Sequence, residues 1–228
     1  VVDPNLTKRM TEYVVLHVLD HHRQMRLHRA AQARREWIGP DQHSADAIRV
    51  GLMGLGEIAQ DAAQVLLRLG FQVSGWSRSP RHVDGVYCYS GADGLEPFLA
   101  RTDILVVLLP LTPDTRGIVD TRLLKGLARD GVLGRPVLIN AGRGGLQVER
   151  DILACLDDGT LGGATLDVFE QEPLPADSAL WTHPLVTITP HNAADSDPDA
   201  ITAYVCGQIA DHERGAPLRN VVDRTRGY

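Results

Sequence analysis

The stretch Val50-Gly51-Leu52-Met53-Gly54-Leu55-Gly56-Glu57-Ile58-Ala59 reads as a strand that runs into a tight turn and then a helix. Gly54 allows the sharp turn, Gly56 lets a ligand's pyrophosphate approach the backbone, and the small Ala59 lets the helix pack closely on a sheet. The free N–H groups and partial positive charge of the helix N-terminus favour the same pyrophosphate. This glycine spacing also occurs in ordinary loops, so the rest of the chain has to decide between a dinucleotide site and a plain turn.

Apolar strands and amphipathic helices alternate along the chain after this turn. We expect strands at residues 48–53, 71–76, 86–89, 104–109, 136–140, 164–168 and 186–188. We expect helices at residues 58–69, 94–100, 123–127, 151–156 and 198–214. Repeated strand–helix units with short connections predict an α/β fold with a doubly wound parallel sheet, whose ligand lies at the carboxyl ends of the strands.

The first part of the chain reads as a single long helix over residues 6–35, preceded by a cap and a first-turn proline at Asp3-Pro4. Residues 13–19 are apolar almost all the way round, which is typical of a helix held between two subunits or domains. Four histidines lie along this helix, at His17, His21, His22 and His28. Because no His-Glu-x-x-His pattern or nearby carboxylate pair accompanies them, we favour solvated or interface histidines and predict no metal site.

Composition excludes several classes of protein. The chain has 228 residues, 43% of them hydrophobic, and a formal net charge of -6, which disfavours a nucleic-acid binder. The three cysteines, Cys88, Cys155 and Cys206, are far apart and suggest neither disulfides nor a metal site. No apolar run is long enough for a membrane span and no signal peptide is visible, so we expect a cytoplasmic protein without membrane contact. The chain begins at Val1 rather than Met, from which we expect a further segment upstream.

The expected second strand ends in Ser77-Arg78-Ser79. In a dinucleotide-binding unit this tip meets the adenine ribose, where a carboxylate would accept hydrogen bonds from a free 2′-hydroxyl. No carboxylate is present here, whereas a guanidinium can pair with a 2′-phosphate through two hydrogen bonds. The tip therefore favours NADP(H) over NAD(H), and the alternative is an ordinary solvated arginine in a turn.

Three later strand ends carry polar residues suited to one reaction. Arg143 follows the strand at 136–140, and an arginine there can hold a substrate carboxylate and polarise the neighbouring ketone. Glu172 and His191 follow the next two strands; a carboxylate beside His191 would raise the pKa of the imidazole and orient it as a general acid. Singly, they could be a surface ion-pair residue, a solvated loop acid and a turn histidine. Their occurrence at successive strand ends favours a site.

These segments resemble the D-isomer-specific 2-hydroxyacid dehydrogenase family from Asp3 to about Ala194. The motifs that carry the resemblance are Gly-Leu-Gly-Glu-Ile-Ala, Leu-Pro-Leu-Thr-Pro-Asp-Thr, Ile-Asn-Ala-Gly-Arg-Gly, Asp-Val-Phe-Glu-Gln-Glu-Pro-Leu-Pro and Thr-Pro-His-Asn-Ala-Ala. Within the family the chain looks most like the glyoxylate/hydroxypyruvate reductase A branch, through Trp76-Ser77-Arg78-Ser79 and the helix beginning Leu6-Thr7-Lys8-Arg9.

The resemblance implies a Rossmann-like domain and NADPH-dependent reduction of a small 2-keto acid, such as glyoxylate or hydroxypyruvate, to the D-2-hydroxy acid. Arg143 would bind the substrate's carboxylate and carbonyl, Glu172 would pair with His191, and His191 would protonate the carbonyl oxygen as hydride arrives. Asp167 would contact the nicotinamide carboxamide. The expected cofactor contacts are Gly54, Gly56, Glu57, Ile58, Ser77, Arg78, Ser79, Leu109, Pro110, Leu111, Thr115, Asn140, Ala141, Gly142, Arg143, Asp167, His191 and Ala193.

The resemblance also implies a domain division. Residues 1–196 would form the dinucleotide-binding domain, with residues 6–35 as the helix of a homodimer. Residues 197–228 would be a C-terminal helix and tail that return to an N-terminal substrate lobe, most of which is not in this sequence. A molecule that truly began at Val1 would bind cofactor with little or no reductase activity. Trp37 would either reach the partner's substrate pocket or be a plain interface tryptophan.

A second class of function is a non-catalytic dinucleotide-sensing interaction protein, because corepressors of this family keep the same fold. The complete set of Arg143, Glu172 and His191, and the lack of any extension resembling a partner-binding segment, favour the enzyme. The residues decide neither the physiological direction of a reversible reaction nor which 2-keto acid is used.

Overall fold

Strand β4 (Ile104–Val107) consists of four apolar residues that are all buried. Successive side chains of a strand point to opposite faces of a sheet. The computed structural model describes residues 4–221. In it, Ile104 and Val106 belong to one hydrophobic core, and Leu105 and Val107 belong to another. A continuous apolar run of this kind is typical of a parallel strand covered by helices on both sides.

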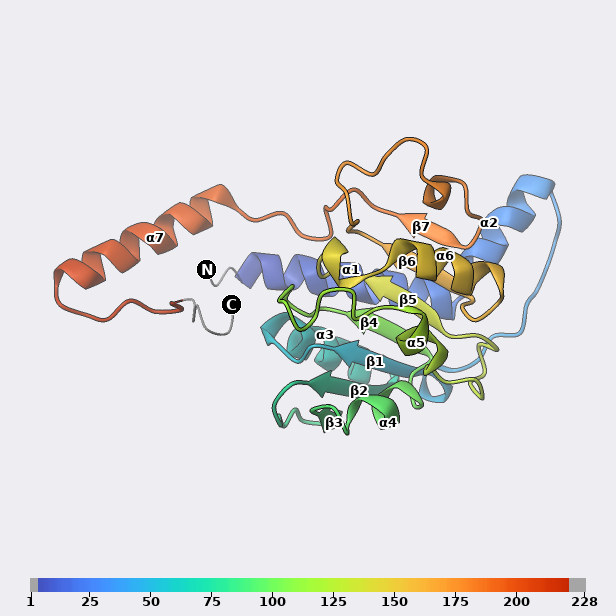
Figure 1. The fold of residues 1–228 in the computed structure, drawn as a ribbon, viewed down its shortest axis with the longest axis horizontal. Coiled ribbons are helices and arrows are strands. Elements are labelled where there is room, and N and C mark those ends of the chain that lie inside the picture. Colours follow the sequence, from blue (N-terminus) through green and yellow to red (C-terminus); the bar gives the residue numbers. More distant parts are fainter. Residues whose placement is uncertain (1–3, 222–228) are drawn as a thin grey trace.

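The sheet has seven strands, all parallel, in the order β3-β2-β1-β4-β5-β6-β7 (Figure 1). They are β1 (Arg49–Met53), β2 (Gln72–Ser77), β3 (Tyr87–Ser90), β4, β5 (Val137–Asn140), β6 (Gly163–Leu166) and β7 (Val186–Ile188). From β1 the chain winds outward through β2 to β3, then returns to β4 and winds the other way to β7. The doubly wound parallel sheet predicted from the sequence is confirmed.

The helices form a layer on each face of the sheet. On one face lie α1 (Pro4–His22) and α3 (Glu57–Arg68), which pack against each other and share a core that includes Val14, Val18 and Leu66. The other face carries α4 (Leu95–Leu99), α5 (Thr121–Lys125) and α6 (Glu149–Asp157). Short 3₁₀ turns occur at Ala45–Ala47, Gly144–Leu146 and Ala179–Trp181.

The prediction of one helix over residues 6–35 is wrong, because the helix breaks after His22 and resumes as α2 (Met25–Arg34). Gln24 between them has a positive φ of 54°. Contacts with a distant segment accompany the break: the Gln24 amide donates to the Asp41 carbonyl over 2.7 Å, and Arg23 Nε donates to the Gln42 side chain over 2.7 Å. These contacts come from a segment that follows both helices, so local sequence gave no sign of them.

The apolar middle of α1 has a partner inside the chain. Tyr13, Val14 and Val18 are buried in the core that α1 shares with α3 and the sheet. Packing within the chain therefore buries most of the apolar surface from which an interface was predicted. Leu16, on the opposite side, keeps 60% of its surface exposed. Among residues 4–221, no helix is both long enough and apolar enough to span a membrane.

Helix α7 (Pro198–Glu213) projects away from the sheet and its helices (Figure 1). None of its side chains is buried, and its polar contacts with the following segment join Tyr204 and Gln208 to Arg219 and Asn220. The structure describes the expected surface tail as far as residue 221. Residues 1–3, with the cap expected at Asp3, and residues 222–228 lie outside the described part.

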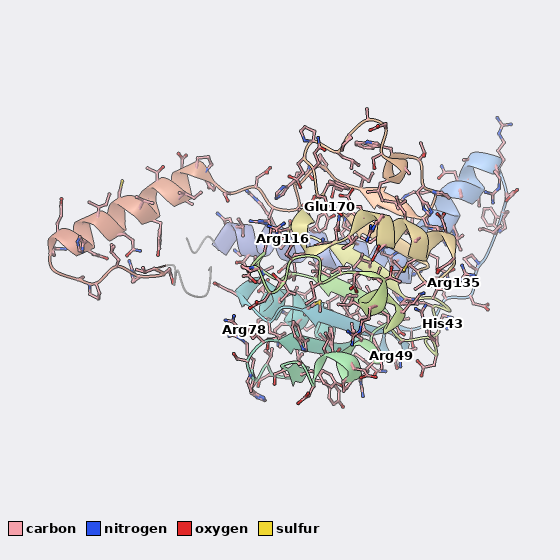
Figure 2. The ribbon with its side chains drawn as sticks, viewed as in Figure 1. His43, Arg49, Arg78, Arg116, Arg135 and Glu170 are labelled. Atoms are coloured by element: carbon pink, nitrogen blue, oxygen red, sulfur yellow. The ribbon has the colours of Figure 1, made fainter. Side chains whose placement is uncertain are left out.

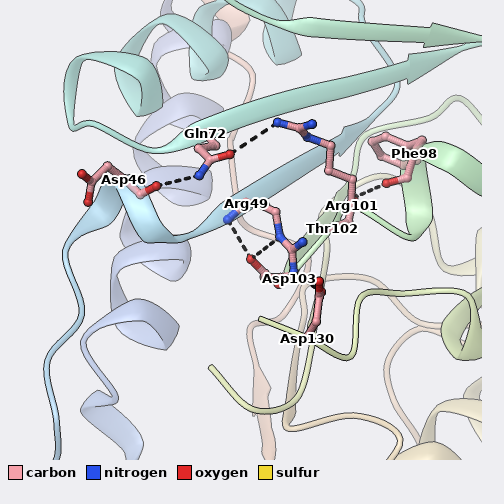
Figure 3. Close-up of polar contacts among 8 residues, drawn as sticks. All are labelled: Asp46, Arg49, Gln72, Phe98, Arg101, Thr102, Asp103 and Asp130. Atoms are coloured by element: carbon pink, nitrogen blue, oxygen red, sulfur yellow. Dashed lines mark hydrogen bonds and ion pairs between the residues drawn. The ribbon is translucent and has the colours of Figure 1, made fainter. Parts of the chain in front are cut away.

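An ion pair and hydrogen bonds join the amino end of β1 to the residue before β4 (Figure 3). Asp103, which is almost fully buried, accepts from the backbone N–H of Arg49 and from its guanidinium at 2.7–3.0 Å, and Asp130 lies 2.7 Å from the same guanidinium. Burial of a carboxylate requires such compensation. The charged side chains at the amino ends of β1 and β4 are therefore paired with one another. A ligand site is expected at the carboxyl ends of the strands.

Candidate active site

A cavity of about 810 Å³ opens at the carboxyl ends of the strands. Its walls come from α1 and from the ends of β1, β2, β4, β5, β6 and β7 with the segments that follow them. The cavity therefore spans the adjacent strands β1 and β4, from which the chain winds in opposite directions. This is the position at which doubly wound sheets bind ligands, and the volume is that of a typical ligand pocket. Figure 2 shows Arg78 and Arg116 at this end of the sheet and Arg49 at the other.

The glycine turn forms one wall. Gly54 has a φ of 108°, and a Cβ atom there would lie 2.9 Å from the Leu108 carbonyl oxygen, so the turn requires glycine. Gly56 caps α3 and borders the cavity, and a Cβ atom on it would meet nothing within 4 Å. The cavity therefore reaches the bare backbone at Gly56 and the first turn of α3, where N–H groups favour an anion.

The tip of β2 brings two arginines to the cavity. Ser77, Arg78 and Ser79, which were predicted to bind the cofactor, line this cavity, and so does Arg81, which the sequence analysis missed. The sequence did indicate Arg81, because it follows Arg78 by three residues in the same segment, which contains no carboxylate. The Ser77 hydroxyl donates to the Ser79 carbonyl over 2.8 Å, so this side chain shapes the loop that carries the arginines.

A buried amide network shapes the loop that carries Arg143. Asn140 is fully buried; its Nδ2 donates to Gln147 Oε1 over 2.7 Å, and its Oδ1 accepts from the Gly142 N–H over 3.0 Å. Gln147 in turn donates to the Val168 carbonyl over 2.9 Å, which ties the ends of β5 and β6 together. Asn140 therefore determines the shape of the turn, and Arg143 is the member of this segment whose charged side chain borders the cavity.

Glu172 and His191 form a hydrogen-bonded pair. Glu172 Oε2 lies 2.6 Å from His191 Nδ1, and its other oxygen accepts from the Phe169 N–H over 3.0 Å. Partial desolvation acts to raise the pKa of Glu172, but its hydrogen bonds from His191 and Phe169 and the charges of His191 and Arg143 outweigh it and hold the pKa below its ordinary value. The carboxylate therefore stays ionised and accepts the Nδ1–H of the imidazole.

Asp167 lies under the loop that carries His191. Its side chain is 1% exposed, and it accepts from the backbone N–H groups of Asn192 and Ala193 at 3.0 and 3.1 Å. The Asp167 carbonyl also accepts from the His191 N–H over 2.8 Å. A loop with a positive φ of 54° at His191 is thereby held from both sides.

The structure gathers most of the predicted residues around one cavity. Those that line it are Gly54, Gly56, Ile58, Ser77, Arg78, Ser79, Leu109, Pro110, Leu111, Thr115, Ala141, Gly142, Arg143, Asp167 and His191. Glu57, Asn140, Glu172 and Ala193 lie beside it without lining it. The sequence analysis missed Leu6, Met10, Leu55, Trp76, Arg81, Leu108, Thr112, Asp114, Ile118 and Ala194. Leu6 and Met10 come from α1, whose pattern indicated only packing.

The described residues, 4–221, contain no group of three or more His, Cys, Asp or Glu side chains placed to hold a metal ion. His17 and His22 of α1 are buried within the chain, so the expectation of solvated or interface positions is wrong for these two histidines. His17 packs against the ring of Tyr13, and His22 packs edge-on against Phe71. Burial lowers the pKa of both histidines.

Residues 15–193 match the family model described as "D-isomer specific 2-hydroxyacid dehydrogenase, NAD binding domain". The chain belongs to this family. It is 39% identical over 226 residues to the glyoxylate/hydroxypyruvate reductase A of Serratia proteamaculans, an alignment that covers 99% of this chain and 71% of the relative. This dehydrogenase chain is therefore an oxidoreductase with a nicotinamide-dinucleotide-binding fold.

Two solved dehydrogenase structures are similar over the whole chain. One is the NADPH-dependent glyoxylate/hydroxypyruvate reductase of Sinorhizobium meliloti in complex with NADP and sulfate, with a TM-score of 0.98 and 54% identity, of which the match covers 72%. The other is a probable 2-hydroxyacid dehydrogenase of Rhizobium etli with NADP, HEPES and tartaric acid, with a TM-score of 0.96, 52% identity and 71% coverage of that chain.

Proposed function

We propose that this dehydrogenase reduces a small 2-keto acid, glyoxylate or hydroxypyruvate, to the D-2-hydroxy acid with NADPH. The observation that carries the proposal is the His191–Glu172 pair at 2.6 Å, on the same cavity as Arg143 and the glycine turn. The names of the Serratia and Sinorhizobium proteins support the choice of substrate and cofactor.

The residues present fit a bound NADP. Gly56 and the first turn of α3 offer a backbone surface for the pyrophosphate, and Arg78 with Arg81 offers two guanidinium groups for the 2′-phosphate. The nicotinamide, when bound, supplies the hydride. Pro110 and Leu111 would flank the adenine, and Asp167, which also lines the cavity, would contact the nicotinamide carboxamide.

The chain's own groups would then handle the substrate's charge and proton. Arg143 would pair with the substrate carboxylate and withdraw electron density from the ketone. His191 directs Nδ1–H to Glu172, which leaves Nε2 to face the ketone oxygen and deliver a proton there. Glu172 stabilises the imidazolium before transfer and holds the ring in place afterwards. In the oxidative direction the neutral imidazole would accept the same proton.

The two helices α1 and α2 support the proposal of a homodimer. Leu16, Leu27 and Ile38 keep 38–60% of their surface exposed, and Trp37 is fully exposed. A second copy would cover these large apolar side chains, which are enriched at subunit interfaces. We also propose residues 1–196 as the dinucleotide-binding domain and α7 with the residues after it as a separate C-terminal segment.

The test is steady-state turnover of the full-length protein with NADPH and with NADH on glyoxylate, hydroxypyruvate, pyruvate and 3-phosphohydroxypyruvate. We expect NADPH and the first two acids to give the highest kcat/KM. His191→Ala should lower kcat by about 10²–10⁴-fold while the Kd for NADPH stays within twofold. Tight NADPH binding without turnover of any 2-keto acid would refute the enzyme in favour of a dinucleotide-sensing interaction protein, and a preference for NADH would refute the role of the β2 tip.

A further inference from the structure

One face of α1 contacts β6 and the segment that follows β7. Tyr13, His17 and His21 are spaced by four residues and therefore share this face. The Tyr13 hydroxyl lies 2.8 Å from Thr189 Oγ1, just after β7, and His21 Nε2 lies 3.0 Å from Thr165 Oγ1 in β6. α1 therefore meets the sheet through hydroxyl contacts as well as apolar packing, and one of these contacts is two residues from His191.

The contact at Thr189 continues to Asp167. The Thr189 hydroxyl donates to Asp167 Oδ1 over 2.6 Å. Because a threonine hydroxyl has a single proton, Tyr13 must be the donor in the 2.8 Å contact. The result is a directed chain in which Tyr13 donates to Thr189 and Thr189 donates to Asp167, and each member is at least partly buried.

Asp167 links this chain to both flanks of His191. Thr189 binds the carboxylate from one side of the histidine, and the N–H groups of Asn192 and Ala193 bind it from the other. A buried carboxylate depends strongly on each of its donors. If the Thr189 hydroxyl were removed, Asp167 Oδ1 would keep, among the described residues, only the Asn192 N–H as a donor, which would weaken the attachment of this loop to Asp167. His191 has the left-handed backbone conformation and lies between these donors, so the direction of its ring depends on how this loop is held.

We propose that Thr189 and Tyr13 are positioning residues for the reaction: through Asp167 they fix the loop 189–193 so that the His191 ring meets Glu172 and the cavity. This inference rests on the proposed function for its kinetic part. It also assigns α1 a role in the site, because a displacement of Tyr13 would reach His191 through only two intervening side chains.

Kinetics of matched variants test the proposal. Thr189→Val keeps the shape and removes the hydroxyl; we expect kcat to fall by about 10–100-fold with the KM and the NADPH Kd within twofold. Thr189→Ser restores a hydroxyl and should recover kcat to within about threefold of the wild type. Tyr13→Phe should lower kcat by about 3–10-fold. Thr165→Val is the control, because it removes the other hydroxyl contact of the same helix face, with His21, and should leave kcat unchanged.

A second readout separates this proposal from the proposed function. Nitrogen-15 NMR of the His191 ring, assigned with His191→Ala, reports the Glu172 contact even in a protein without turnover. We expect Thr189→Val to move the ring signals and Thr189→Ser and Thr165→Val to leave them in place. Unmoved signals in Thr189→Val, or an equal loss of kcat in Thr189→Val and Thr165→Val, would overturn the positioning role. Absence of turnover in the wild type with the expected NMR shifts would overturn only the proposed reaction.

Discussion

Acidification should destabilise this protein through one histidine of α1. Burial lowers the pKa of His21 from 6.5 to about 4; the carboxylate of Asp20 opposes this effect, and His17 and Arg26 add to it. Its Nε2 is 3.0 Å from the hydroxyl of Thr165 in β6. Between pH 6.5 and 4 the unfolded chain therefore holds a proton on His21 that the folded chain does not. Stability contributed by the neutral ring is complete above pH 6.5 and is lost as the pH falls towards 4.

The size of the effect follows from the two pKa values. At about 1.36 kcal/mol per pH unit, the interval from 6.5 to about 4 corresponds to about 3 kcal/mol of unfolding free energy. About 2 kcal/mol of this is already lost at pH 5. Domains of this kind are stable by only about 5–15 kcal/mol, so the loss is measurable.

Urea unfolding at pH 7.5 and pH 5.0 provides the assay. Other groups also titrate in this interval, so the informative quantity is the wild-type loss minus the loss in His21→Gln, which we expect to be about 2 kcal/mol. His82→Gln is the control, because its ring is 89% exposed, and it should lose as much stability as the wild type. An equal loss in the wild type and in His21→Gln would refute the reasoning.

Four further predictions concern the site and the assembly. The double substitution of Arg78 and Arg81 by alanine should raise the Kd for NADPH by about 10²-fold or more and leave the Kd for NADH within threefold, as measured by fluorescence titration. Glu172→Gln should lower kcat by about 10–100-fold with NADPH affinity retained, and unchanged turnover would exclude the pair from catalysis. Gly144→Ala should destabilise the fold by more than about 3 kcal/mol in calorimetry, because its Cβ would overlap the backbone of Phe169, whereas Gly207→Ala in α7, with open space around it, should not destabilise it. For the proposed homodimer through α1, Leu16→Asp should halve the mass seen by light scattering, and an unchanged mass would refute this face as the interface.

The order of strands and helices was predictable because its signals are local. The strand at 186–188 agrees with the structure, and the others differ from it by one or two residues at their ends. The strand expected at 104–109 ends earlier, at Val107, three residues before Pro110, which has no N–H to donate. The strand ends then placed Arg143, Asp167 and His191 at one edge, because parallel strands direct their carboxyl ends the same way.

Features that depend on distant partners were not predictable. The break at Gln24 has no glycine or proline to announce it and accompanies contacts with residues 41 and 42. Asn140 was predicted to contact the cofactor from its place in a motif, but its hydrogen bonds to Gln147 and Gly142, which shape the turn, were not predicted. The hydroxyl of Tyr13 gave no sign in the sequence of its contact with Thr189.

That contact between Tyr13 and Thr189 joins residues 176 positions apart, the first helix and the segment after the last strand. Closing a loop of this length costs more entropy than pairing neighbouring elements, and contacts of high sequence separation form slowly. During refolding, the strand and helix signals should therefore recover before the His191 loop is set. A chain that assembles in this order would have His191 among the last of its described residues to be ordered, so a partly folded chain would lack the geometry that the proposed reaction needs.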